Sequence, residues 1–219
     1  MSEITIHSGE TFERVFLNEP NIDLHITQEA DSHVKIHLLY LPSKSSSLSS
    51  EEGRGEVWVI QAGRDCSTEI YALAFLHGEE KVTTETHVKH AVGEGTSNQL
   101  IKFVLADKSR GRFVGDLKIA QDAQKTEAHQ TNRNLLLSDE AEMRTQPQLE
   151  IYADDVKATH GASTGQLDES ALFYMQQRGI DKQKARQLLV GAFMKDVLAT
   201  ISDETLKEQL LNSIDGVVE

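Results

Sequence analysis

The first three quarters of the chain alternate apolar and polar residues with a period of two, and this alternation limits the fold more than any other feature. Ile22, Leu24 and Ile26 lie on one side of the chain, for example, and the polar residues between them lie on the other. The pattern recurs over residues 34–40, 70–76, 113–119 and 149–153. A period of two is that of β-strands with one buried face.

Clusters of turn residues separate these segments, and no helical pattern interrupts them. They are Gly53-Arg54-Gly55, Gly63-Arg64-Asp65, Gly78-Glu79-Glu80, Gly93-Glu94-Gly95 and Ser109-Arg110-Gly111. Many short strands predict a mainly β architecture, which leaves a sandwich, a barrel and a β-helix open. Aromatic residues make up only 5% of the chain, and a core this poor in large side chains favours a narrow solenoid. The Ser-rich stretch 42–55 is expected to be a loop.

The period changes near the C-terminus, where helical spacing begins. Asp168 is predicted to cap a helix that stops at Gly179, Asp181 to cap a longer helix, and Ser202 or Asp203 to cap a third. The spacing on the second helix predicts a buried face made of Ala185, Leu188, Leu189, Ala192, Phe193, Val197 and Ile201.

Two domains are therefore expected, a β core over residues 1–166 and a small helical C-terminal domain over residues 167–219. A net charge of −13 argues against nucleic acid or an anionic membrane as the main partner, because both attract basic surfaces. The single cysteine, Cys66, allows no intrachain disulfide. The chain has no signal-peptide pattern at its N-terminus and no apolar run long enough for a membrane span, so we expect it in the cytoplasm.

The sequence contains no phosphate-binding loop and no nucleophile elbow, so a catalytic site is not expected. Of the nine histidines, His87 and His90 lie three apart, which on a strand places them on opposite faces and prevents joint ligation of one ion. His33 and His37 share a face with Lys35, which predicts that this face is exposed to solvent. His160 follows the alternation of its strand and precedes Gly161, which predicts a tight turn directly after the histidine.

Several short blocks near the C-terminal end resemble the SufB/SufD family of iron–sulfur cluster assembly proteins, and its SufD branch in particular. They are Gln130-Thr131-Asn132-Arg133-Asn134-Leu135-Leu136-Leu137-Ser138, the stretch from Pro147 to Lys157, Thr159-His160-Gly161-Ala162-Ser163-Thr164-Gly165, Phe173-Tyr174 and Arg178-Gly179-Ile180. Each block alone is weakly specific, and their order and spacing together carry the resemblance, which extends from about Gly111 to about Ala199.

The resemblance implies a right-handed parallel β-helix with a helical C-terminal domain. It also implies a non-catalytic scaffold that pairs with a SufB-like subunit, or with a second copy of itself, and binds a SufC-like ATPase through its C-terminal helices. The family's interface histidine, which helps to hold a transient iron–sulfur cluster shared with the partner, corresponds to His160. Candidate anchors for the ATPase are Phe173, Tyr174, Arg178 and Phe193.

The sequence departs from the family pattern in two ways. Well-known SufD proteins have a cysteine two residues before the histidine, where this chain has Ala158, so any thiolates must come from the partner. Such proteins are also about twice as long, which suggests a short variant or a fragment. A regulatory or truncated paralogue without cluster chemistry therefore stays open, as do a cupin-like metalloenzyme and a β-helix protein that acts on acidic polysaccharides.

Overall fold

Twelve strands alternate between two parallel sheets and form a β-solenoid, which confirms the predicted fold class. The computed structural model describes residues 1–42 and 52–214. Sheet A contains β1 (Ser2–Ile6), β3 (Asn21–Gln28), β5 (Gly53–Gln61), β7 (Lys81–His90), β9 (Arg110–Ile119) and β11 (Glu142–Ile151). Sheet B contains β2 (Thr11–Leu17), β4 (His33–Tyr40), β6 (Ser67–Leu76), β8 (Thr96–Leu105), β10 (Thr126–Leu136) and β12 (Val156–Gln166).

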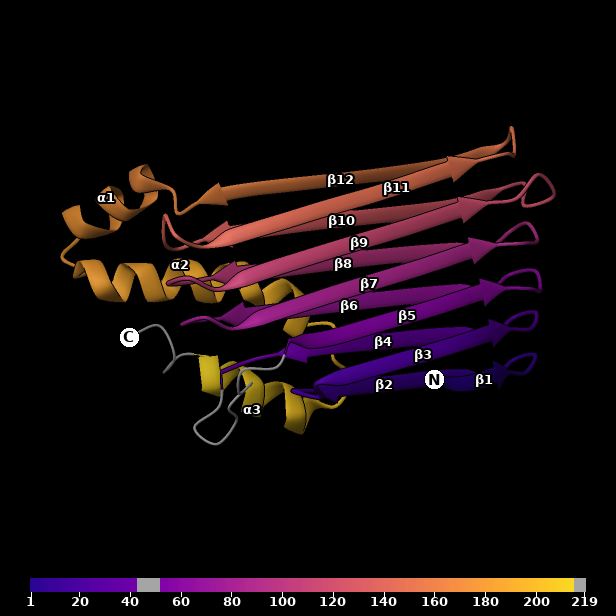
Figure 1. Ribbon diagram of the computed structural model, residues 1–219, viewed down its shortest axis with the longest axis horizontal. Coiled ribbons are helices and arrows are strands. Elements are labelled where there is room, and N and C mark those ends of the chain that lie inside the picture. The colour runs from indigo at the N-terminus through magenta and orange to yellow at the C-terminus, as the bar shows by residue number, and fades with distance from the viewer. Residues whose placement is uncertain (43–51, 215–219) are drawn as a thin grey trace.

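Each strand pairs with the strands two before and two after it, so the chain winds in coils that stack on one another (Figure 1). Thr126 of β10, for example, pairs with Val156 of β12. The alternating apolar residues of both sheets point inward and form the core, as in Ile36 of β4 and Phe113 of β9, which are fully buried. All twelve strands pair in parallel, which excludes the antiparallel jelly roll of a cupin.

Three of the predicted turns lie where expected, at residues 63–65, 78–80 and 93–95. The predicted turn at Gly53-Arg54-Gly55 is wrong, because these residues begin β5. Gly55 marks a close approach rather than a turn, because a Cβ at this position would lie 2.8 Å from the hydroxyl of the buried Tyr40. The turn predicted at Ser109 lies two residues earlier, and β9 begins at Arg110. Residues 43–51 of the predicted Ser-rich loop lie outside the described part of the chain.

Three helices follow the strands, at α1 (Glu169–Gln177), α2 (Lys182–Leu198) and α3 (Glu204–Ile214). Their caps are as predicted. The Asp168 carboxylate accepts from the Ser170 amide at 2.8 Å, Asp181 accepts from Lys184 at 3.0 Å, and Asp203, rather than Ser202, accepts from Leu206 at 3.0 Å. Among the described residues, no helix combines the length and apolar character that crossing a bilayer requires.

α2 and α3 cover the outer face of sheet B and form a second apolar cluster with it, whereas α1 packs on α2. This cluster contains Val190, Met194 and Val197 of α2, together with outward-facing residues such as Leu73 of β6. The predicted buried face of α2 is therefore partly wrong: Leu188 is 43% exposed, whereas Val190 and Met194 are buried. The apolar pattern of α2 runs almost around the helix, and the sheet below it determines which side is covered. The division into two domains stays a prediction.

A buried lysine fixes α2 to sheet B. Lys102 of β8 points outward under the helix and is 1% exposed. Its ammonium donates to the Asp196 carboxylate and to the Phe193 carbonyl, each at 2.6 Å, and lies 4.6 Å from the Phe193 ring centroid. A buried charge needs such partners, because losing one leaves an uncompensated ion in a medium of low polarity.

His37 also lies under the helices, so the prediction that the face of His33 and His37 is exposed holds at His33 and is wrong at His37. The side chain is fully buried, contacts the Thr200 hydroxyl at 2.8 Å and stacks on the Tyr71 ring. Burial, with a smaller effect of Lys35, lowers the pKa of His37 from 6.5 to about 4. Inside the solenoid, His90 contacts the Ser97 hydroxyl at 2.8 Å, and burial lowers its pKa to about 4 as well.

Because these two histidines are buried, we expect the protein to lose stability in mild acid. In the unfolded chain, His37 and His90 bind protons below about pH 6.5, whereas in the folded chain they stay neutral down to about pH 4. The free energy of unfolding should be unaffected above pH 6.5 and fall by on the order of 1–2 kcal/mol per histidine at about pH 5. Urea unfolding at pH 7 and pH 5 should show a smaller decrease for His37→Gln than for the wild type. His33→Gln, at an exposed position of the same strand, should keep the wild-type decrease, and equal decreases in all three proteins would contradict the assignment.

Candidate functional site at the open end of the solenoid

The last coil of the solenoid, formed by β11 and β12, has no further strand stacked on it in the described part of the chain. β11 pairs with β9 and β12 pairs with β10, and each lies at the edge of its sheet (Figure 1). The inward positions that are buried in earlier coils are therefore uncovered here. Ile151 is 43% exposed although it pairs with the fully buried Ile119.

His160 lies in the middle of β12. The tight turn predicted after it is wrong, because β12 continues through Gly161 to Gln166. An extended strand accommodates glycine without turning, and Gly161 has open space around it. Register places His160 beside Gln130 of β10, which pairs in turn with Gln99 of β8. His160 therefore belongs to an inward-facing column of the sheet and is exposed because it ends that column.

The column below His160 is polar, unlike most of the core. Gln130 is 1% exposed, and its amide nitrogen lies 3.4 Å from the Gln99 carbonyl oxygen, which also accepts from the Thr86 hydroxyl at 2.7 Å. Gly115 of β9 leaves room for Gln130, since a Cβ at this glycine would lie 2.5 Å from the amide nitrogen. Buried amides need hydrogen-bond partners, and this column meets the need only in part, since Gln99 Nε2 and Gln130 Oε1 have no partner among the described residues.

A pair of asparagines connects β10 to β12 beside this column. Asn132 and Asn134 exchange amide hydrogen bonds at 2.9 and 2.7 Å. Asn134 also donates to the Ser163 carbonyl at 3.2 Å and to the Thr164 hydroxyl at 3.1 Å, both on β12. The asparagines of the block that supports the family resemblance thus hold the strand that carries His160.

His160 is the one metal-binding side chain on the inward face of β12, whose other members are Val156, Ala158, Ala162, Thr164 and Gln166. Ala158 is partly buried against the core and shares this face with His160, so a thiol at this position would lie on the same side. His129 of β10 is nearby but faces outward, where its ring contacts the Thr159 hydroxyl at 2.8 Å. The described chain thus offers a single imidazole here, and a cluster would need thiolates from elsewhere.

The edge of β12 lacks the features that usually prevent strands from pairing with other chains. It is 11 residues long, and from Ala158 to Gln166 it contains neither proline nor a lysine, arginine or carboxylate side chain. β11, by contrast, contains Pro147 and several charged side chains. A long, exposed and unguarded edge strand is a template for pairing with another chain.

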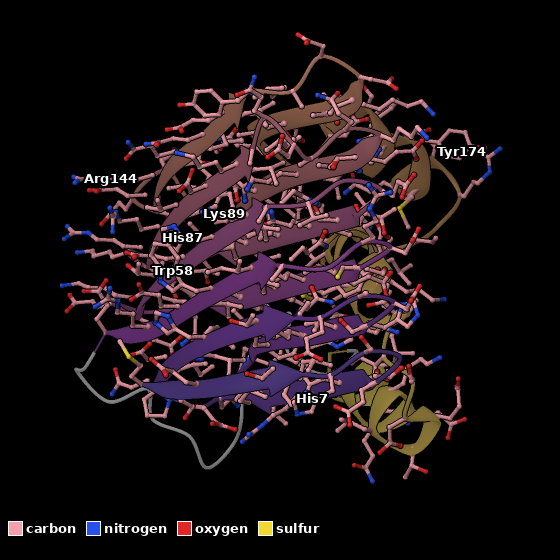
Figure 2. All side chains as sticks on the ribbon, turned by 90° about the vertical axis from the view of Figure 1, so that its right-hand side faces the viewer. His7, Trp58, His87, Lys89, Arg144 and Tyr174 are labelled. Carbon is pink, nitrogen blue, oxygen red and sulfur yellow. The ribbon has the colours of Figure 1, made fainter. Side chains whose placement is uncertain are left out.

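The helices present a second exposed surface. Phe173 and Tyr174 of α1 are 62% and 57% exposed, and the Arg178 guanidinium lies 3.7 Å from the Tyr174 ring centroid. Tyr174 projects on the helical side of the molecule (Figure 2). Phe193 differs, since it is half-buried against sheet B beside Lys102. A groove of ≈ 300 Å³ lies along α2 and α3, lined by Lys184, Gln187, Leu188, Gly191, Ala192, Lys195 and Leu211.

The sequence predicted His160 and the exposed aromatic residues of α1 as candidates, which stay predictions, and it gave no sign of the groove, the polar column or the edge. Leu188 lines the groove because the buried face of α2 is rotated from the predicted one. Gln99 and Gln130 carry no sequence signal of their own, because a lone polar residue in an apolar strand is not informative without the register. The prediction that His87 and His90 face opposite sides is confirmed, but His90 is buried inside the solenoid rather than at the surface.

Comparison with known proteins identifies one protein family. Residues 22–193 match the family described as "SUF system FeS cluster assembly, SufBD core domain". The iron–sulfur cluster assembly protein SufD of Escherichia coli (strain K12) is 42% identical over 152 residues, which cover 69% of this chain and 36% of that protein. The SufBD family protein slr0076 of Synechocystis is 32% identical over 206 residues, which cover 90% of this chain and 46% of that protein.

The protein ABCI7 of Arabidopsis thaliana, a chloroplast protein, is 32% identical over 194 residues, which cover 88% of this chain and 39% of that protein. The chain thus spans less than half the length of these curated relatives. The family match covers the strands from β3 onward and reaches into α2, so it includes the open coil and His160. This chain is a member of the SufBD family of iron–sulfur cluster assembly proteins.

Proposed function

We propose that this chain is a non-catalytic scaffold subunit that pairs through β11 and β12 with a SufB-like partner in the cytoplasm. The observation that carries the proposal is the uncovered last coil, with an unguarded edge strand and an exposed, inward-facing His160. A second solenoid laid against this end would add hydrogen bonds to the free edges and cover the apolar inward positions. A second copy of this chain could occupy the same end, and the native mass distinguishes the two assemblies.

In this proposal the iron–sulfur cluster is cargo held between the two subunits. His160 supplies one imidazole nitrogen to iron, which is a suitable ligand when neutral and held in a fixed orientation. Gln130 below it and the Asn134 contacts to β12 limit the movement of the strand. The partner supplies the thiolates, because Ala158 cannot.

We further propose that a SufC-like ATPase binds the helices. The stacked pair of Tyr174 and Arg178, with Phe173 beside it, offers the aromatic and arginine anchors that dominate protein interfaces. The groove along α2 and α3, with Leu188 and two lysines, offers a further surface on the helices. Because α2 is fixed to β8 through Lys102, a force on the helices would be transmitted to sheet B, which carries His160.

One alternative has a specific observation in its favour. Ala158 replaces the cysteine expected beside His160, so the chain could act as a regulatory paralogue that assembles without cluster chemistry. The two functions differ in the effect of removing the imidazole.

The interface is tested by a charge on each face of β12. Ala162→Arg places a cation on the inward face of the open end, whereas Ser163→Arg places one on the outward face of the next residue. Co-expressed with SufB-like and SufC-like proteins of the same cell, the wild type and Ser163→Arg should give one complex by native mass. Ala162→Arg should reduce its yield by about tenfold or more, because a desolvated, unpaired charge costs several kcal/mol. A full yield with Ala162→Arg would show that the open end is not the interface.

The role of His160 is tested in the assembled complex. His160→Ala should keep the complex and lower the amount of cluster formed in reconstitution, measured as iron and sulfide content and as visible absorption. His129→Ala removes an exposed histidine of the neighbouring strand that faces outward, and it should leave cluster formation unchanged. If both variants assemble clusters as the wild type does, the protein is a structural or regulatory partner.

The ATPase surface is tested by truncating the stacked pair. Tyr174→Ala together with Arg178→Ala should weaken ATPase binding by about tenfold or more, because aromatic and arginine anchors supply much of an interface's energy. Gln176→Ala, at an exposed position of the same helix, serves as the control. Calorimetric titration with the purified ATPase gives the affinities, and an unchanged affinity of the double variant would refute docking at α1.

A further inference from the structure

The outer face of sheet A carries a cluster of side chains that the assembly function does not use. Figure 2 shows Trp58 and His87 on the side of the solenoid that faces away from the helices. Register pairs Glu56 with Glu85 and Trp58 with His87, since β5 and β7 are neighbours. Glu85 and His87 lie two residues apart on one strand, so both point to the same face.

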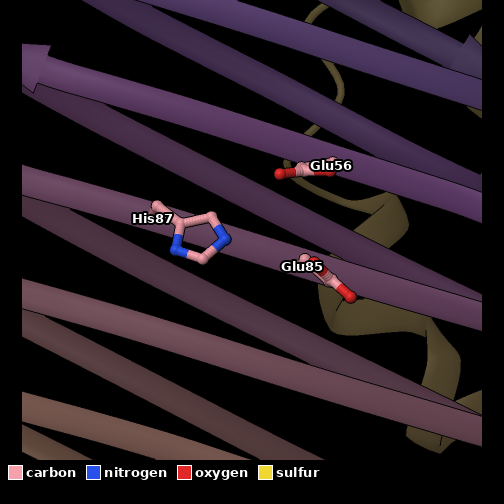
Figure 3. Close-up of side chains that lie close together, drawn as sticks. All are labelled: Glu56, Glu85 and His87. Atoms are coloured by element: carbon pink, nitrogen blue, oxygen red, sulfur yellow. The ribbon is translucent and has the colours of Figure 1, made fainter.

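Three of these side chains present ligand atoms to one point. One atom each from Glu56, Glu85 and His87 lies within 4.8 Å of the others. Figure 3 shows the imidazole turned so that one ring nitrogen faces the two glutamates. The other nitrogen, Nδ1, lies 3.6 Å from the Asp116 carboxylate of β9, so the nitrogen that faces the glutamates is Nε2. Both ring nitrogens are shielded from solvent, and neither has a hydrogen-bond partner among the described residues.

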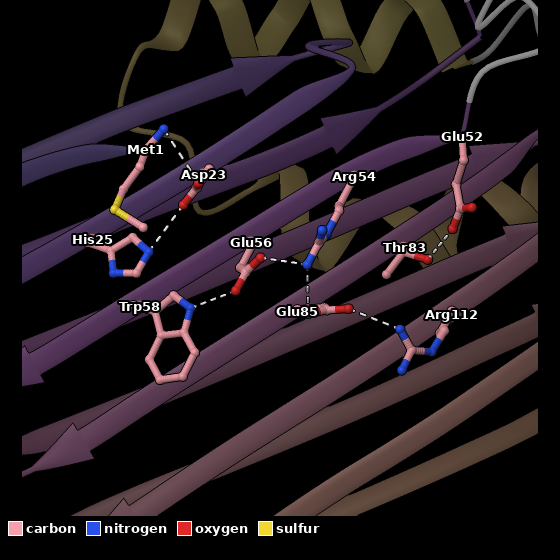
Figure 4. Close-up of polar contacts among 10 residues, drawn as sticks. All are labelled: Met1, Asp23, His25, Glu52, Arg54, Glu56, Trp58, Thr83, Glu85 and Arg112. Atoms are coloured by element: carbon pink, nitrogen blue, oxygen red, sulfur yellow. Dashed lines mark hydrogen bonds and ion pairs between the residues drawn. The ribbon is translucent and has the colours of Figure 1, made fainter.

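Each glutamate uses one oxygen to fix its orientation (Figure 4). The Trp58 indole N–H donates to Oε1 of Glu56 at 2.7 Å, and Arg112 donates to Oε1 of Glu85 at 2.9 Å. These contacts resemble the outer hydrogen bonds that orient metal-binding carboxylates. Asp116 is placed to do the same for the Nδ1 side of the imidazole.

The second oxygen of each glutamate is held by one shared cation, Arg54. Its guanidinium lies 2.7 Å from Oε2 of Glu56 and 3.4 Å from Oε2 of Glu85 (Figure 4). Arg54 is 54% exposed, whereas the side chains of Glu56, Glu85 and His87 are 21%, 15% and 15% exposed. The arginine thus covers the cluster from the solvent side and can swing away without unpacking the core.

We propose that Glu56, Glu85 and His87 form a binding site for a divalent transition-metal ion, which replaces the Arg54 guanidinium between the two carboxylates. One imidazole and two carboxylates suit borderline ions such as Zn²⁺ or Co²⁺, whereas Mg²⁺ and Ca²⁺ take oxygen ligands. Small side-chain rotations bring the three atoms from their present separations to bonding distance. The site lies on β5 and β7 of sheet A, away from the open coil, so its test is independent of the assembly function.

The site contains its own reporter. Trp58 is the single tryptophan of the chain, and its ring stacks on His87 with centroids 3.7 Å apart and an interplanar angle of 10°. A metal ion bound to the imidazole therefore changes the surroundings of the indole, and Co²⁺ quenches its fluorescence. His25 lies on the other side of Trp58 with centroids 5.8 Å apart, and it pairs with Asp23 rather than with the cluster.

The experiment titrates Zn²⁺ and Co²⁺ into the metal-free full chain at neutral pH and follows Trp58 fluorescence and visible Co²⁺ absorption. We expect one equivalent to bind. His87→Gln and Glu85→Gln should each raise the Kd by at least about tenfold. Arg54→Gln should lower the Kd several-fold, because it removes the competing cation. His25→Gln is the matched control and should stay within about twofold of the wild type.

Two results would overturn the site. A Kd of His87→Gln equal to that of the wild type would mean that the metal binds elsewhere in the chain. An Arg54→Gln variant that unfolds at a lower temperature and gains no affinity would mean that the cluster is an ion-pair network only. If His87→Gln does not fold, as judged by thermal unfolding, Glu85→Gln carries the same test, and a Zn²⁺ Kd of this variant equal to that of the wild type would also reject the assignment.

Discussion

The structure depends on one constraint, the parallel pairing of each strand with the strands two places away in the sequence. This pairing places residues about 30 positions apart in columns, as His129 beside Thr159 shows. The side chains of one column must therefore suit one another in size and polarity along the whole stack. Where the column is apolar it forms the core, and where it is polar, as at Gln99 and Gln130, one amide contact at 3.4 Å joins neighbouring coils. A coil in the middle of the stack is stable because it is covered on both sides, and the last coil is covered on one side.

The same constraint leaves the last coil uncovered on one side. Its strands have the hydrogen-bonding and apolar character of an inner coil, but half of it is uncovered. Covering the apolar positions and pairing the free edge of β12 are favourable for the same physical reason that stacks the other coils. In the proposed assembly, a partner with a matching end extends the stack and encloses His160 between the two chains.

The helices are held by side-chain contacts rather than by strand pairing. They are attached to the outer face of sheet B through an apolar cluster and through the buried Lys102, whose charge requires Asp196. Sheet A is not covered in this way, so its outer face depends on cross-strand contacts between polar and aromatic side chains, such as the stack of Trp58 on His87. The two faces of the solenoid thus differ: sheet B packs against helices, whereas the outer face of sheet A carries the largely shielded cluster of Glu56, Glu85 and His87.

The sequence by itself determined the local structure and the family. The period of two indicated the strands, Asp168, Asp181 and Asp203 marked the helix starts, and the blocks around Asn132, His160 and Tyr174 indicated the SufBD family. These features are readable because they depend on neighbours a few residues away. Only the tertiary structure decided that β12 runs on past Gly161, that His37 is buried while Leu188 is exposed, and that Glu56 meets Glu85 and His87. Each of these depends on strand register or on which helix face meets the sheet, and contacts between residues about 30 positions apart leave no periodic trace in the chain.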